Sequence, residues 1–169
     1  MSLSFHSDDA QSLWQGVIHA ETALRESLHA FLSASPKDRL DLVRHALRRP
    51  GSDRSVAIRV VPYLSLADRQ TLFPDLVWLA SWGHGLVQNA RDAILSLPRA
   101  WVLQRIEEVA QPLLSQSSEQ GQFEEYRRLL ELYRQLGDPD LVRRFAELAV
   151  QHSDDDVQEA GREFLAQSR

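Results

Sequence analysis

Residues 72–95 carry the clearest structural signal in this chain, and they read Leu72-Phe-Pro-Asp-Leu-Val-Trp-Leu-Ala80, then Ser-Trp, then Gly83-His-Gly-Leu-Val-Gln-Asn-Ala-Arg-Asp-Ala-Ile-Leu95. Both halves have apolar residues at helical spacing, and the glycines Gly83 and Gly85 mark a tight turn between them. The first half contains an internal proline, and the second begins with the pattern V-x-x-A. The stretch therefore predicts two helices folded into a hairpin.

The same hairpin pattern recurs on both sides of this stretch. A V-x-x-A sequence starts at Val157, and Val56 opens an earlier second helix in which Arg59 replaces the alanine. Val56 and Val87 are 31 residues apart, and Val87 and Val157 are 70 apart, which is twice 35. Because self-similarity at a fixed period is typical of repeat arrays, a further hairpin is expected between them, at residues 99–136.

These hairpins resemble HEAT repeats over residues 37–167. In that family a proline bends the first helix, here Pro74 and Pro112, and the small residues of the second helix let the two helices approach closely. The resemblance implies a right-handed α-solenoid of about four helical hairpins with an N-terminal capping helix. An irregular helical bundle, in which each helix simply ends at its proline, is the alternative.

Helical periodicity runs along the whole chain, so the fold class is predicted to be all-α. We expect helices at 8–33, 37–48, 53–64, 66–81, 85–96, 99–115, 122–136, 139–151 and 155–167. The 169 residues are predicted to form a single domain, residues 1–169, with an N-terminal helix at 8–33 and hairpins at 37–64, 66–97, 99–136 and 138–167. The N-terminal helix has an apolar stripe that could serve as an end cap or a dimer contact.

The composition offers few groups for chemistry. The chain has no cysteine, which excludes thiolate catalysis and sulfur-ligated metal sites, and its six histidines never fall at i, i+4 spacing. Neither a nucleophile elbow nor a phosphate-binding loop is present. His152 is followed by Asp154, Asp155 and Asp156, which we interpret as N-cap and helix-dipole charges. We therefore expect no enzyme activity, no cofactor and no metal site.

No apolar run approaches the length of a membrane span, and the first residues lack the pattern of a secretory leader. The expectations are no membrane association and a cytoplasmic location.

Charge is unevenly distributed along the chain, whose net charge is −5 with 24 acidic and 19 basic residues. Residues 37–59 contain seven basic and three acidic groups, which is a local excess of four positive charges. The candidate basic patch within this segment consists of Arg44, Arg48, Arg49 and Arg54. The isoelectric point of about 5.7 argues against nucleic acid as the main ligand, because phosphate contacts dominate that affinity.

A helical array without convergent chemistry favours a non-catalytic protein–protein interaction or scaffold module whose partner is another protein. The candidate partner-binding residues are those on the second helices that are turned away from the apolar stripes: Arg59, Gln88, Arg91, Asp92, Arg127, Arg128, Glu159 and Arg162.

A DNA-binding or DNA-glycosylase-type protein of the HEAT-like kind is the alternative. In such proteins tryptophan and aspartate on a concave face hold a damaged base, and Asp75, Trp78 and Trp82 are of these residue types. In this alternative the 37–59 patch would contact phosphates. Packing between repeats is the other interpretation of both tryptophans.

Overall fold

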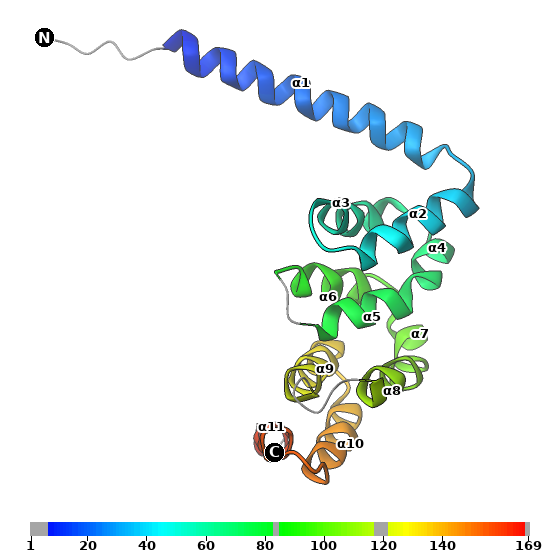
Figure 1. The fold of residues 1–169 in the computed structure, drawn as a ribbon, viewed down its shortest axis with the longest axis vertical. Helices are drawn as coiled ribbons and strands as arrows, with labels where there is room; N and C mark the ends of the chain where they lie inside the picture. The colour runs from blue at the N-terminus through cyan, green and yellow to red at the C-terminus, as the bar shows by residue number, and fades with distance from the viewer. Residues whose placement is uncertain (1–6, 83–84, 117–121, 168–169) are drawn as a thin grey trace, which may run out of the picture. The chain divides into compact units, whose positions relative to one another are not determined.

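The computed structural model describes residues 7–82, 85–116 and 122–167, and every regular element in these ranges is helical (Figure 1). The α-helices are α1 (Ser7–Leu32), α2 (Pro36–Arg48), α3 (Ser52–Val60), α4 (Leu66–Thr71), α5 (Phe73–Ser81), α6 (Val87–Leu95), α7 (Arg99–Leu103), α8 (Ile106–Gln116), α9 (Gln122–Leu136), α10 (Pro139–Val150) and α11 (Asp155–Gln167), with a short 3-10 helix, η1, at Val61–Tyr63. The prediction of an all-α fold is confirmed. The predicted turn residue Gly83 and the histidines at positions 6 and 84 lie outside the described residues.

Contacts between residues divide the chain into two compact units, Met1–Asp41 and Leu42–Arg169, with the boundary inside α2. We call them the N-terminal unit and the C-terminal unit. The N-terminal unit consists mainly of α1, a single helix of 26 residues. None of the helices in the described residues is both long enough and apolar enough to cross a membrane.

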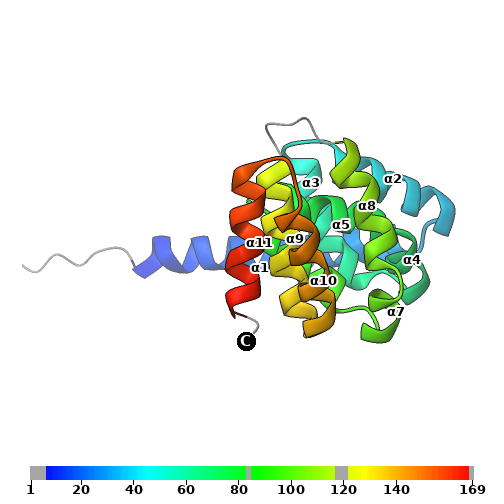
Figure 2. The same cartoon turned by 90° about the horizontal axis from the view of Figure 1, so that it is seen from below.

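The helices of the C-terminal unit pack in the order in which they occur in the sequence. Two pairs form antiparallel neighbours, α5 with α6 and α10 with α11. In addition α3 contacts α6, α6 contacts α9, and α9 contacts α11 (Figures 1 and 2). These four helices therefore form a continuous row of neighbours. The largest fully buried side chains are distributed over several helices rather than one centre: Leu47, Leu72, Phe73, Leu76, Leu79, Ile94, Ile106, Leu129, Leu130, Leu132, Tyr133 and Leu141.

Pro74 does not bend a helix, contrary to the sequence-based expectation. The predicted helix at 66–81 is divided at Leu72, where α4 has ended and α5 is about to begin. Pro74 therefore lies in the first turn of α5, where a missing backbone N–H costs no intrahelical hydrogen bond. Pro112, by contrast, lies inside a helix as predicted, although the predicted helix at 99–115 is divided into α7 and α8, with Gln104 and Arg105 between them.

The valine and alanine of both V-x-x-A patterns are buried, but the valine of the degraded pattern at Val56 is not. Val87, Ala90, Val157 and Ala160 all lie in the core. Val56, which the sequence pattern places at the start of the second helix of the first hairpin, lies inside α3 and is 58% exposed, so this expectation is wrong. The reason is positional, because α3 buries Ala57 and Ile58 instead of Val56.

The helices α10 and α11 approach each other closely at Gly161. A Cβ atom built on this glycine would lie 2.7 Å from the Ala146 carbonyl oxygen and 2.9 Å from the Val150 nitrogen. Such distances are far below van der Waals contact, so glycine is required for the backbones to pack this closely.

Candidate partner-binding groove

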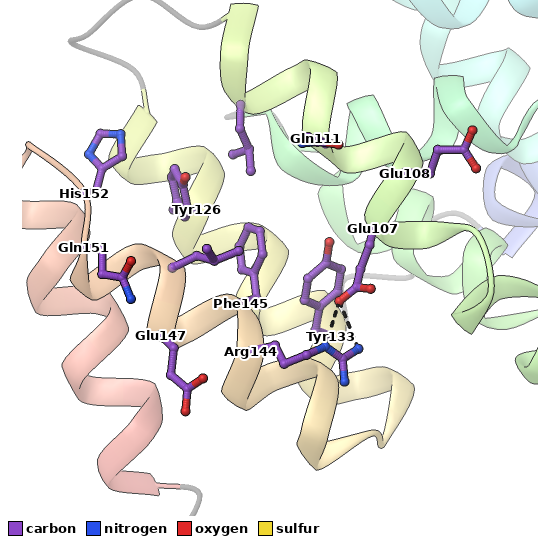
Figure 3. Close-up of a pocket in the computed structure, with 12 residues that line it drawn as sticks. Glu107, Glu108, Gln111, Tyr126, Tyr133, Arg144, Phe145, Glu147, Gln151 and His152 are labelled. Atoms are coloured by element: carbon purple, nitrogen blue, oxygen red, sulfur yellow. Dashed lines mark hydrogen bonds and ion pairs between the residues drawn. The ribbon is translucent and has the colours of Figure 1, made fainter.

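A groove of about 950 Å³ lies among α8, α9, α10 and the turn after α10 (Figure 3). A smaller cavity, of about 340 Å³, lies near the start of α10 and the end of α11. The lining residues of the larger one are Glu107, Glu108, Gln111, Leu114, Tyr126, Tyr133, Arg144, Phe145, Glu147, Leu148, Gln151 and His152. They come from helices that are neighbours in the sequence, and all lie within the C-terminal unit.

Aromatic rings form one wall of the groove. The rings of Tyr126 and Phe145 are stacked, with centroids 5.2 Å apart, and Tyr133 meets Phe145 edge to face at 4.9 Å. The His152 imidazole lies 5.3 Å from the Tyr126 ring. Aromatic pairs at such distances attract each other by about 0.5–1.5 kcal/mol beyond the effect of burial, so these rings support one another.

Tyr133 is the most deeply buried of these residues. Its side chain is inaccessible to solvent, and its hydroxyl has no hydrogen-bond partner among the described residues. Burial raises the pKa of Tyr133 well above its ordinary value, and the nearby Glu107 carboxylate raises this pKa further. The hydroxyl therefore remains protonated, and it points toward the Glu107 side of the groove (Figure 3).

The rim of the groove is predominantly acidic. Glu107, Glu108 and Glu147 contribute three carboxylates, and Arg144 contributes one guanidinium. Arg144 Nη2 donates to Glu107 Oε1 at 3.0 Å and so links α10 to α8 across the groove. These four side chains give the rim a net charge of −2.

The helix that begins after the groove is capped as the sequence predicts. Asp154 Oδ1 accepts hydrogen bonds from the backbone nitrogens of Asp156 and Val157 at 2.9 and 3.4 Å. The backbone nitrogen of Asp154 in turn donates to His152 Nδ1 at 3.1 Å. In the part of the chain that the structure describes, no three His, Asp or Glu side chains are grouped in a way that could hold a metal ion.

Arg91 differs most from its sequence-based interpretation. Arg91 is only 6% exposed. The helical spacing predicts instead that its side chain is turned away from the apolar stripe of α6 and is exposed to solvent. Arg91 Nη2 donates to Glu131 Oε2 at 2.6 Å and to the Arg128 carbonyl oxygen at 3.0 Å. The expected exposure is wrong because α9 packs over this face of α6 and supplies both acceptors.

The other candidate partner-binding residues remain at least partly accessible. Arg59, Gln88, Asp92, Glu159 and Arg162 are exposed, while Arg127 and Arg128 are half-buried. Arg127 approaches Glu163 at 3.4 Å, and Arg128 Nη2 pairs with Glu124 at 2.8 Å. The structure thus brings Arg91, Arg127 and Arg128 together on α6 and α9, but none of the eight residues lines the groove.

The basic patch is largely engaged in contacts within the chain. The Asp75 carboxylate is buried and accepts hydrogen bonds from Arg48 Nε at 2.7 Å and Arg44 Nε at 3.4 Å. Arg49 pairs with Asp53 at 3.5 Å.

Arg54 Nε donates to the Leu47 carbonyl oxygen at 2.8 Å, and its guanidinium lies 5.4 Å from the centre of the Trp78 ring. Trp78 is half-buried and lies 5.5 Å from the exposed ring of Trp82. Together with Asp75 these residues form a packed cluster on α2, α3 and α5.

Sequence reasoning did not find the groove. None of the tyrosine or glutamate residues that line the groove is among the candidate partner-binding residues that the sequence indicates. The available signal for the groove was the presence of two tyrosines in the apolar stripe of the 122–136 helix. A tyrosine hydroxyl in a core position requires either a hydrogen-bond partner or an adjacent space.

No family model matches this chain, and no curated protein shows significant sequence similarity to it.

Proposed function

We propose that this chain is a non-catalytic protein-interaction module and that its C-terminal unit is an α-solenoid built of HEAT-like hairpins. The ordered contacts α3 to α6, α6 to α9 and α9 to α11 support this architecture, since each repeat of a solenoid contacts its neighbours. A cytoplasmic location stays a prediction from the sequence.

The observation that carries the function is the groove, with its aromatic wall and acidic rim. The half-buried Tyr126 ring is apolar surface that the groove offers, and the buried rings of Phe145 and Tyr133 pack behind it. Clefts of this size that combine apolar surface with a few polar groups are typical binding sites. The net negative rim favours a basic ligand and disfavours phosphates. The proposed partner is therefore a protein segment with an aromatic or aliphatic anchor flanked by lysine or arginine.

A pair of labelled synthetic peptides tests this proposal. Both contain the same tryptophan and leucine residues, one flanked by lysines and the other by glutamates. The native chain is expected to bind the lysine peptide at least about tenfold more tightly, which corresponds to ~1.4 kcal/mol, as measured by fluorescence anisotropy. Equal affinity for the two peptides would contradict the proposed charge preference.

Two charge-reversed variants locate the binding site. Glu108→Arg with Glu147→Arg reverses the rim charge and is expected to weaken lysine-peptide binding at least about tenfold. Asp92→Arg with Glu159→Arg makes the same change in charge on the exposed second-helix surface and serves as the matched control. If only the control variant loses binding, the partner site is on the second helices and the groove is not used.

The DNA-binding alternative receives less support from these contacts, because each arginine of the basic patch already has a partner within the chain. Its own test is duplex binding at low salt, which should weaken steeply as salt is added.

A further inference from the structure

The helix α1 exposes an apolar stripe over most of its length. Leu13, Trp14, Val17 and Leu24 are between 55% and 73% exposed, and Ile18 is 38% exposed. Helical stability in proteins comes mainly from the packing of an amphipathic face rather than from intrinsic propensity. A helix of 26 residues with this much exposed apolar surface therefore indicates a binding surface.

The stripe has the spacing of a coiled-coil seam. Six positions alternate at intervals of three and four residues, and all six are exposed: Ala10, Leu13, Val17, Ala20, Leu24 and Ser27. Intervals of three and four that sustain a 3.5-residue average are those at which two helices keep one seam in contact. The chain itself thus supplies a matching surface, in the form of a second copy of α1.

We infer that two copies of this chain associate through α1 in an antiparallel pair. In this orientation two seam residues from different copies face each other when their residue numbers add up to 37. Leu13 therefore meets Leu24 of the other copy, and Val17 meets Ala20. In the central layers of this pair, leucine therefore packs against leucine, and valine packs against alanine. In a parallel pair Ala20 would face Ala20 and Ser27 would face Ser27, and both layers would leave space unfilled.

Charge and dipoles favour the same orientation. Glu21, next to the seam, is already paired with Arg25 at 2.6 Å on the same helix, and in the antiparallel pair it lies beside Trp14 rather than beside a second carboxylate. Antiparallel helices also place the positive end of each macrodipole near the negative end of the other. Two seams about 26 Å long bury on the order of 1,000 Å², which is the lower limit for a specific interface.

Sedimentation equilibrium of the full chain tests the association. The native chain is expected to be dimeric at concentrations of tens of micromolar, and Leu13→Asp with Leu24→Asp is expected to make it monomeric. Gln15→Asp with Thr22→Asp adds the same charge on the opposite face of α1, and this control should remain dimeric. A native chain that stays monomeric overturns the inference. If in addition Leu13→Asp with Leu24→Asp lowers its melting temperature, α1 packs on its own chain.

The absence of cysteine from the sequence gives a direct test of orientation. Leu13→Cys and Leu24→Cys chains, distinguished by an affinity tag on one of them, are oxidised separately and as a mixture. The mixture should form the tagged–untagged disulfide at least about tenfold faster than either variant cross-links with itself. Rapid self-cross-linking of each variant alone would show a parallel pair and overturn the antiparallel arrangement.

Discussion

Individual charged residues on these helices differ in their roles more than their sequence positions indicate. Arg91 and Gln88 are both polar residues on α6, yet Arg91 is buried against Glu131 whereas Gln88 is exposed and pairs with Asp92 on its own helix at 2.8 Å. Asp75 is likewise buried between arginines rather than exposed. Arg91 is therefore a poor choice for probing partner binding, because replacing it would break a contact between α6 and α9.

Replacing Tyr133 by phenylalanine should change the pH dependence of stability. The pKa of Tyr133 is raised in the folded chain, so above the ordinary tyrosine pKa of about 10 the unfolded chain ionises and the folded chain does not. The free energy of unfolding should then fall as pH rises above about 10, by about 1.4 kcal/mol per pH unit for this tyrosine. Tyr133→Phe should remove that part of the slope in urea unfolding at about pH 9 to 11.

At neutral pH the same variant should be as stable as the native chain or more so, because the lost hydroxyl is buried without a partner among the described residues. Tyr63→Phe, which changes an exposed ring, is the control and should keep the slope of the native chain. A loss of more than about 1 kcal/mol in Tyr133→Phe at neutral pH would show that the hydroxyl makes a stabilising hydrogen bond.

At the scale of elements, helix ends follow from local chemistry more closely than helix contacts do. Asp138 caps α10 by accepting hydrogen bonds from the backbone nitrogens of Asp140 and Leu141, both at 3.1 Å, and Gly137 precedes it with a positive φ of 69°. The sequence predicts this junction because proline, aspartate and glycine act through their own backbone. The contact of α10 with α11 depends in addition on Gly161, whose position against Ala146 no local pattern specifies.

Gly161→Ala should destabilise the C-terminal unit. Alanine is the better helix former by about 1 kcal/mol, yet its Cβ would overlap the Ala146 carbonyl oxygen and force α10 and α11 apart. We expect a net loss of about 1–3 kcal/mol in urea unfolding. Gly16→Ala in α1, where an added Cβ would meet no atom within 4 Å beyond the backbone of its own helix, is the control and should increase helicity. A gain in stability for Gly161→Ala would mean that the two helices can separate without cost.

At the scale of the whole molecule, the division into two units separates two proposed activities. The groove belongs to the C-terminal unit, and the dimerisation seam belongs to α1 in the N-terminal unit. Because the core residues of the C-terminal unit contact one another, its stability should not require α1.

A chain that begins at Ser35 keeps α2 complete and removes α1. It should unfold cooperatively in a thermal melt followed by circular dichroism, bind the lysine peptide with the affinity of the native chain, and sediment as a monomer. A truncated chain that lacks cooperative unfolding would show that α1 completes the core of the C-terminal unit.

The sequence by itself determined the all-α class, most helix boundaries, the cap at Asp154, and the buried positions Val87, Ala90, Val157 and Ala160. These features depend on residues within one or two helical turns of each other, so spacing alone reveals them. It did not reveal the break at Leu72, since a proline at 74 is compatible with either a bend or a new helix.

Only the tertiary structure decided which helix faces meet and which space remains open. The groove combines Glu107, Tyr133 and His152, and the burial of Arg91 depends on Glu131, which is 40 residues away. Contacts over such distances depend on how separate helices pack, and periodicity within one helix contains no information about its neighbour. The chemistry of this protein's surfaces was therefore set by packing, and its helices were set by local sequence.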